Sequence, residues 1–265
     1  MEDVRLTAFK RLLDIMDELR EKCPWDREQT FDTLRTMTIE ETYELSDAIM
    51  SKDMNEIRKE LGDILLHIVF YAKMGDEQGV FDITNIINSL CDKLVYRHPH
   101  VFAETEVKNA GEVVQNWEQL KVKEKDGNKT ILSGVPNSLP ALIKANRIQE
   151  KAAAVGFDWE QREQVWDKFQ EECNELKTEI AALDKEQMES EFGDVFFSLV
   201  NAARLYGIDP ETALERTNRK FIYRFTYLEQ KTIRQGRSLK DMSLDEMDVI
   251  WEEAKRNEQS HPKAG

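Results

Sequence analysis

The sequence predicts an all-α protein built from two copies of one helical unit, and three observations predict it. Apolar residues recur at the three- and four-residue spacing of an amphipathic helix along most of the chain. Only 11 glycines and 6 prolines occur among 265 residues, so long stretches contain no helix breaker. No stretch of alternating apolar and polar residues bounded by turns predicts a β-strand.

The first half of the chain contains four predicted helices. Apolar periodicity predicts helices over residues 4–22, 33–50 and 56–74. A fourth helix is expected to begin after Phe81 and to end at His98-Pro99, because proline cannot continue a helix and restricts the residue before it. The two histidines of RHPH are typical of a loop end rather than of a metal site, since no cysteine or third histidine lies near them.

A linker is predicted over residues 123–140, KEKDGNKTILSGVPNSLP, where two glycines and two prolines follow a run of charge. The helical pattern resumes at Ala141. We therefore expect an amino-terminal helical domain over 1–122 and a carboxy-terminal helical domain over 141–265.

Composition excludes several classes of partner. The formal net charge of −15 argues against a nucleic-acid binder, because phosphate backbones are held by clustered Lys and Arg. No apolar run approaches the ~18 residues of a membrane span, and the start, MEDVRLTAFKRLL, is typical of a charged helix rather than a signal peptide. Three cysteines in no metal-binding spacing fit a reducing compartment. We expect a cytoplasmic protein with no nucleic-acid or membrane partner.

An internal repeat links the two halves. EETYEL at 40–45 returns as EECNEL at 171–176, and ELGDIL at 60–65 returns as EFGDVF at 191–196, so both motifs recur at one and the same spacing along the chain. Two further patterns recur in the same order with small gaps: Lys93-x-x-x-Arg97 with Lys220-x-x-x-Arg224, and Trp117-x-x-x-Lys121 with Trp251-x-x-x-Lys255. Four features in one order indicate two copies of a single helical unit.

Each copy carries two pairs of carboxylates, E-x-x-E and then E-x-x-D. They are Glu41, Glu44, Glu60 and Asp63 in the first copy, and Glu172, Glu175, Glu191 and Asp194 in the second. Residues three apart share one face of a helix. If the chain reverses at the polar Lys52-Asp53 and Asp184-Lys185, each pair of helices becomes an antiparallel hairpin with four carboxylates at one height.

Four like charges at that distance raise at least one pKa unless a cation lies among them. Oxygen ligands alone suit Mg²⁺, with Mn²⁺ as a substitute, rather than zinc. Di-iron bundles use Glu-x-x-His on two helices, whereas the matching positions here hold carboxylates. Apolar neighbours predict that the helices around Asp63 and Asp194 are buried, which weighs against a solvated cluster; these neighbours are Leu61, Ile64, Leu65 and Ile68, and Phe192, Val195, Phe196 and Leu199.

At these residues the sequence resembles the MazG family of nucleoside triphosphate pyrophosphohydrolases, within the all-α NTP pyrophosphatase superfamily. EETYELSDAI, ELGDILLHIVFYAKM, DKLVYRHPHVF and NWEQLK resemble its amino-terminal unit. VGFDW, EECNEL, EFGDVFFSLVNAARL, NRKFIYRF and WEEAK resemble its carboxy-terminal unit. The resemblance runs from Leu6 to Lys255 and is to the two-domain bacterial form.

The resemblance implies a Mg²⁺-dependent enzyme that cleaves a nucleoside triphosphate between the α- and β-phosphates, giving a monophosphate and pyrophosphate. It implies that the carboxylates of both copies bind the metal, and that a homodimer forms. It places Lys168, Asn218, Lys220, Arg224, Trp251 and Lys255 on the substrate, with Lys93, Arg97, Trp117 and Lys121 as counterparts in the first copy. The proton of the attacking water would go to Glu171 or to a ligating carboxylate, Glu172 or Glu175, and the residues do not decide between them.

The copies are unequal. Lys168 stands one turn before Glu172, whereas Met37 stands one turn before Glu41. Asn218 and Phe221 around Lys220 become Cys91 and Leu94 around Lys93. We therefore expect the second copy to be the main active site, and the first to be weakly active, regulatory or structural. The alternatives are a helical nucleotide- or protein-binding module without catalysis, and a purely structural scaffold; base and sugar preference is not predicted.

Overall fold

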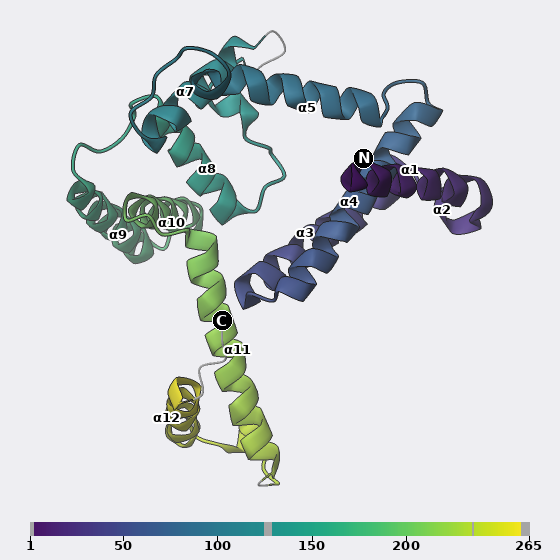
Figure 1. The fold of residues 1–265 in the computed structure, drawn as a ribbon. Coiled ribbons are helices and arrows are strands. Elements are labelled where there is room, and N and C mark those ends of the chain that lie inside the picture. The colour runs from purple at the N-terminus through teal and green to yellow at the C-terminus, as the bar shows by residue number, and fades with distance from the viewer. Residues whose placement is uncertain (1–2, 125–128, 235, 261–265) are drawn as a thin grey trace. The chain divides into compact units, whose positions relative to one another are not determined.

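The computed structural model describes residues 3–124, 129–234 and 236–260 (Figure 1). Its α-helices are α1 Val4–Lys22, α2 Pro24–Glu28, α3 Phe31–Ser51, α4 Met54–Glu77, α5 Ile83–Arg97, α6 Pro99–Phe102, α7 Ala110–Lys123, α8 Ala141–Ala154, α9 Val165–Ala182, α10 Lys185–Leu205, α11 Pro210–Arg234 and α12 Leu244–Ser260. Short 3₁₀ helices cover Leu132–Gly134, Arg162–Gln164 and Leu239–Asp241. No strand occurs in these ranges, and the all-α prediction is confirmed.

The chain divides into two compact units. One comprises residues up to Val95 together with the described residues after Asn257, and the other comprises residues 96–257. The second unit contains α7 as well as α8, because these two helices pack against each other. Of the predicted linker, residues 125–128 lie outside the described part of the chain. The domain boundaries predicted from the sequence stay a prediction.

In the first unit, α3 and α4 form an antiparallel hairpin with a two-residue turn (Figure 1). Lys52 ends α3 in the left-handed conformation, with φ of 56°. Asp53 then caps α4, and its carboxylate accepts the backbone N–H groups of Asn55 at 2.9 Å and Glu56 at 3.2 Å. The cap satisfies amide groups that have no partner within the helix, so the polar pair fixes where the chain reverses.

The second unit repeats this turn between α9 and α10. Leu183 is left-handed, with φ of 59°, and Asp184 accepts the N–H groups of Glu186 at 3.1 Å and Gln187 at 3.2 Å. A left-handed residue followed by an aspartate cap therefore closes both hairpins. The reversal expected at Lys52-Asp53 is present. The reversal expected at Asp184-Lys185 falls one residue earlier, at Leu183-Asp184, because Lys185 is already the first residue of α10.

The core of the first unit lies where α1 and α3 cover α4. Its fully buried residues are Met16, Leu34, Val69, Phe70 and Met74. Phe31 stacks on Tyr71 with ring centroids 5.7 Å apart, and the Tyr71 hydroxyl lies 2.8 Å from Thr38 Oγ1. In the second unit α8 packs on α10 as α1 packs on α4.

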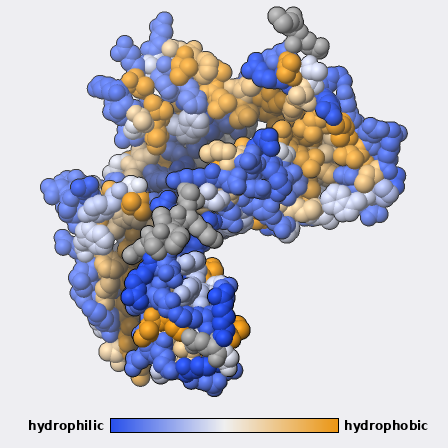
Figure 2. Space-filling view, turned by 60° about the horizontal axis from the view of Figure 1, so that its bottom comes forward, coloured by the Kyte–Doolittle hydropathy of each residue, from blue (hydrophilic) through white to orange (hydrophobic). Residues whose placement is uncertain are grey.

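The expectation that apolar neighbours bury the helices around the carboxylates is wrong for the single chain. Phe196 is 60% exposed and Leu61 is 52% exposed, and Leu65, Ile68, Phe192 and Leu199 are exposed as well. Figure 2 shows apolar surface of this kind in orange among polar areas. The physical reason is that α4 and α10 carry apolar residues on more than one face, and the hairpin partner covers one of them.

Within the described residues, no helix is long and apolar enough to cross a membrane.

Candidate metal and nucleotide site

The second hairpin gathers three predicted ligands. Carboxylate oxygens of Glu172 and Glu175 from α9 and of Glu191 from α10 all lie within 4.8 Å of one another. Glu172 is buried, and Glu191 Oε2 is buried without a hydrogen-bond partner among the described residues. Asp194, one turn after Glu191, falls outside this group, although it lines the same cavity as Glu172.

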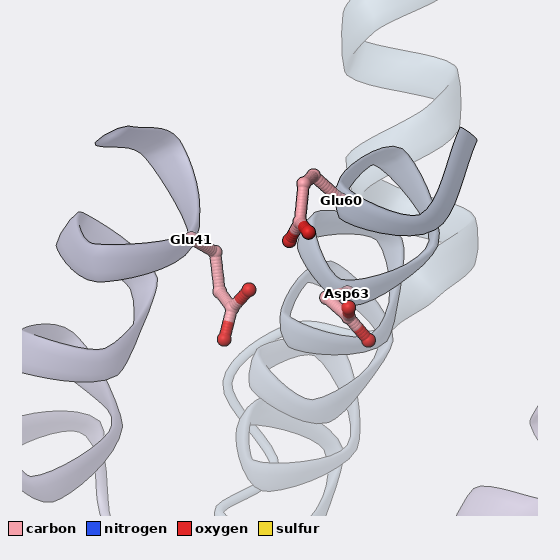
Figure 3. Close-up of side chains that lie close together, drawn as sticks. All are labelled: Glu41, Glu60 and Asp63. Atoms are coloured by element: carbon pink, nitrogen blue, oxygen red, sulfur yellow. The ribbon is translucent and has the colours of Figure 1, made fainter. Parts of the chain in front are cut away.

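The first hairpin gathers Glu41 from α3 with Glu60 and Asp63 from α4, again within 4.8 Å (Figure 3). In Figure 3 the side chains of Glu41 and Glu60 point toward each other across the space between the two helices, and Asp63 lies next to Glu60 on the same helix. Glu60 is 2% exposed; its Oε1 accepts Lys59 Nζ at 2.8 Å, while its Oε2 is buried without a partner among the described residues. Glu44 is exposed and is not part of the group.

Electrostatics in both clusters agree with the repulsion expected from the sequence. Burial raises the pKa of the Glu41 carboxyl, and the nearby Asp63, Glu44 and Glu60 charges raise it further. Burial likewise raises the pKa of Glu175, together with a hydrogen bond and the charge of Glu172 and the charge of Glu191. Crowded carboxylates with raised pKa values and buried unpaired oxygens fit a hard divalent cation.

Lys168 is the predicted cation that the structure places at the second cluster. Its Nζ lies 2.8 Å from Glu172 Oε1 and 2.9 Å from Glu171 Oε1. The hydrogen bonds to Glu171 and to Glu172 raise the pKa of Lys168 above its ordinary value. The counterpart Met37 packs against the core of the first unit instead.

Two of the other predicted cations, Arg97 and Arg224, contact the two repeated tryptophans. The Arg224 guanidinium lies 5.9 Å from the ring of Trp251, and the Arg97 guanidinium lies 5.4 Å from that of Trp117. The same arginine–tryptophan contact in both copies supports the repeat found in the sequence. Phe221 also contacts Trp251, with ring centroids 5.2 Å apart.

Several predicted substrate residues already have acidic partners or face solvent. Lys255 pairs with Glu252 at 2.6 Å and Lys121 with Glu118 at 3.0 Å. Asn218 donates to Glu215 at 3.3 Å. Lys93 and Lys220 are exposed, and neither Lys220 nor Lys255 contacts the second carboxylate cluster in the described structure.

Comparison with known proteins agrees with this geometry. The model of the MazG nucleotide pyrophosphohydrolase domain matches residues 29–102 and 161–227, which enclose the two carboxylate sets. The nucleoside triphosphate pyrophosphohydrolase of Escherichia coli K12 is 44% identical over 260 residues, 96% of this chain and 99% of that protein. The nucleoside triphosphate pyrophosphohydrolase/pyrophosphatase MazG of Thermotoga maritima is 42% identical over 255 residues, 95% of this chain and 97% of that protein. The chain belongs to the MazG family.

As a MazG protein, the chain is a nucleoside triphosphate pyrophosphohydrolase, a hydrolase that acts on phosphoanhydride bonds. The resemblance stated from the sequence is confirmed. The MazG domain matches do not include α7, α8 or α12, so Trp117 and Trp251 lie outside them.

A buried ion-pair network joins α7 to α8 in the second unit. Glu118 is 4% exposed, and its carboxylate is 2.6 Å from Lys151 Nζ and 2.6 Å from Arg147 Nη2. Burial alone would raise the pKa of Glu118, but the hydrogen bonds and charges of Lys151 and Lys121 prevail and lower it to about 2. Lys151 is 2% exposed, so the buried Glu118 carboxylate and the buried Lys151 ammonium each serve as the counter-charge of the other. Lys121, which the family resemblance places on the substrate, is part of this ion-pair network.

Sequence reasoning missed the polar groups beside the second cluster. A cavity of about 620 Å³ is lined by Glu172 of this cluster and by Asp194, and Gln149, Ser198 and Asn201 also line it. A signal for two of them was present, because Ser198 and Asn201 follow Asp194 by four and seven residues and so continue its helix face. Gln149 lies on another helix, and no spacing pointed to it.

Proposed function

We propose that the carboxy-terminal unit is the main active site and that it hydrolyses nucleoside triphosphates between the α- and β-phosphates, with Mg²⁺, or Mn²⁺ in its place, held by Glu172, Glu175, Glu191 and Asp194. The observation that carries this proposal is the crowded carboxylate group on α9 and α10, which opens on one side to a cavity and has Lys168 beside it. The E. coli and T. maritima relatives, which align over nearly the whole chain, are both called nucleoside triphosphate pyrophosphohydrolases, which supports the substrate class.

When bound, Mg²⁺ supplies charge neutralisation and a template for the phosphate oxygens. Phosphoryl transfer depends mostly on positioning and on stabilising spread negative charge, which suits a site rich in fixed charges. Lys168 would contribute there, since it is held beside Glu172. Lys220, Arg224 and Lys255, with Trp251 near the nucleotide, are the further substrate residues that the family resemblance implies.

The hydrolysis needs no reactant other than the triphosphate and water. The oxygen of a water molecule bonds to the α-phosphorus, and the bond from that phosphorus to the α,β-bridging oxygen breaks. Pyrophosphate leaves with the electron pair, and the water proton passes to Glu171 or to a ligating carboxylate. Glu171 is exposed and lies 2.9 Å from Lys168.

We propose that the first copy contributes less to the hydrolysis than the second copy does. Its carboxylates are gathered as tightly as those of the second copy. It lacks the lysine, however, because Met37 occupies that position and packs into the core. A weakly active, regulatory or structural role is consistent with a cluster that keeps its carboxylates but has no lysine at the position of Lys168; its own lysine contact, Lys59 Nζ to Glu60 Oε1 at 2.8 Å, comes from α4 instead.

The test of the proposed function follows products in ¹⁸O-labelled water with Mg²⁺. We expect equal amounts of monophosphate and pyrophosphate, with the label in the monophosphate, because attack is at the α-phosphorus. Orthophosphate, or label in the pyrophosphate, would contradict the cleavage site. A helical binding module would bind nucleotide and release no product, and a scaffold would show no rise in melting temperature with Mg²⁺ and nucleotide.

A homodimer is proposed from the uncovered apolar surface. Phe192, Phe196 and Leu199 are each at least 45% exposed on α10, and apolar patches of this kind mark association surfaces. We expect light scattering to give the mass of two chains, and Phe196→Glu to shift the result toward the mass of one. Phe157→Glu, a matched change of an 84% exposed residue on a loop, should leave the mass unchanged; equal masses for wild type and Phe196→Glu would refute this surface. The cytoplasmic location stays a prediction.

A further inference from the structure

The carboxylates of the first hairpin divide into an inner pair nearer to the turn and an outer pair farther from it. Because the chain reverses between α3 and α4, the inner pair is Glu44 and Glu60. The outer pair is Glu41 and Asp63. Both members of the outer pair join the gathered group, whereas only Glu60 of the inner pair does so. The counterpart of the missing Glu44 is Glu175, which does belong to the gathered group of the second copy.

Lys59 of α4 lies at the end of the cluster from which Glu44 is missing. Its Nζ is 2.8 Å from Glu60 Oε1 and 3.6 Å from Glu56 Oε2. A hydrogen bond and the charge of Glu60 raise the pKa of the Lys59 ammonium, and the charges of Glu56 and Glu44 raise it further. The ammonium group therefore stays positively charged and interacts with both carboxylates of the inner pair.

The Glu60 carboxylate presents one oxygen to this lysine and the other to the interior of the cluster. The residue is 2% exposed, and its Oε2 is buried without a hydrogen-bond partner among the described residues. Buried polar atoms are nearly always paired, so Oε2 indicates room for a further cation beside Lys59. The Lys59 side chain itself is 60% exposed, so replacing it opens no cavity in the core.

The second copy places its lysine at the opposite end. At the repeat spacing, Lys59 corresponds to Ser190. The lysine of this copy, Lys168, contacts Glu172 of the outer pair at 2.8 Å, and the other outer carboxylate, Asp194, is the one left out of the group. In each copy the carboxylate that is left out thus lies at the end where a lysine binds, although the two lysines occupy different positions of the repeat.

We propose that Lys59 competes with a divalent metal ion for the first carboxylate cluster and keeps Glu44 out of its ligand set. This inference rests on the proposed function for the choice of metal, and it gives the smaller contribution of the first copy a physical cause. An ammonium group and a divalent ion that share the Glu60 carboxylate repel each other. Lys59 therefore reduces the repulsion among the carboxylates when no metal is bound, and it lowers the metal affinity of this copy.

The experiment measures binding of Mn²⁺ to the full chain by isothermal titration calorimetry. All chains carry Glu172→Gln and Glu175→Gln, so that the first cluster is measured alone. We expect Lys59→Ser to lower the Kd for Mn²⁺ by about 10-fold, because a positive charge beside the ion is removed. Lys59→Arg keeps the charge and should keep the Kd within about twofold. Arg58→Ser removes the same charge at the exposed preceding position, and screening by salt should keep its Kd within about twofold as well.

A second measurement tests whether Glu44 is excluded by the lysine. Glu44→Gln should change the Kd by less than about threefold while Lys59 is present. In the Lys59→Ser chain the same change should raise the Kd by about 10-fold, because Glu44 then serves as a ligand. Such coupling between two positions is what a double-mutant cycle detects. Equal effects of Glu44→Gln in both chains would overturn the exclusion of Glu44.

The other outcomes are equally decisive. Equal Kd values for Lys59→Ser and Arg58→Ser would overturn the competition, and so would a Lys59→Arg chain that binds Mn²⁺ as tightly as Lys59→Ser. Failure of every chain in this background to bind Mn²⁺ would also overturn it. The metal of the proposed function is tested separately in a chain with Glu41→Gln and Glu60→Gln, which keeps the second cluster. If that chain binds no Mn²⁺, the proposed function fails, whatever the result for Lys59.

Discussion

We expect Glu172→Gln to lower kcat for nucleoside triphosphates by about 100- to 1,000-fold, because a metal centre contributes several kcal/mol of transition-state stabilisation and each ~1.4 kcal/mol is tenfold in rate. The substitution keeps the shape of the side chain and removes the charge of this buried carboxylate, which we propose as a metal ligand. Single-turnover measurements at saturating Mg²⁺ separate this loss from weaker substrate binding.

The matched control is the same change in the other copy, Glu41→Gln. If the carboxy-terminal unit is the main active site, this variant keeps most of the activity. The metal-free fold should tolerate both changes, since each removes one of several repelling charges. Melting curves without metal check this point. Loss of turnover in Glu41→Gln with retention in Glu172→Gln would assign the main activity to the amino-terminal copy.

The second large effect is on stability. We expect Glu118→Gln to lower the free energy of unfolding by about 3–5 kcal/mol, because it leaves the buried Lys151 ammonium without its counter-charge. Urea denaturation at neutral pH measures the difference. Glu150→Gln is the control, since this carboxylate pairs with Arg147 at 43% side-chain exposure and should cost under about 1 kcal/mol.

The pH dependence of this difference has a definite sign. Since the pKa of Glu118 is lowered from 4.5 to about 2, its contribution is fully present above pH 4.5. This contribution is lost as the pH falls from 4.5 toward about 2, because the Glu118 carboxylate then becomes protonated in the folded protein as well as in the unfolded chain. The stability gap between wild type and Glu118→Gln should therefore shrink between these two values. A gap below about 1 kcal/mol at neutral pH would show that the network does not stabilise the fold.

The features that could be predicted from the sequence are those that depend on residues close together in the chain. Periodic apolar residues set the helices, and a polar pair containing an aspartate marked each chain reversal, so three of four carboxylates in each copy met as expected. Burial was mispredicted at Phe196 and Leu61, because a helix with two apolar faces does not reveal which face its own chain covers.

The cavity could not be predicted from spacing. It depends on how α8 crosses α10, a contact between residues 48 positions apart in the case of Gln149 and Phe197. The network around Glu118 likewise depends on the packing of α7 on α8. Long-range packing of this kind is decided by the whole set of side chains at an interface rather than by any local pattern.

The tight reversals at Lys52 and Leu183 have a consequence for how this architecture can vary. Each connection uses one left-handed residue and one capping aspartate, and has no slack. One residue inserted within α10, between Asp184 and Glu191, would shift Glu191 by about 100° around the helix axis relative to the capping aspartate, so that it would no longer face Glu172. The spacing from each capping aspartate to the acidic residues of the following helix is therefore constrained as tightly as the acidic residues themselves.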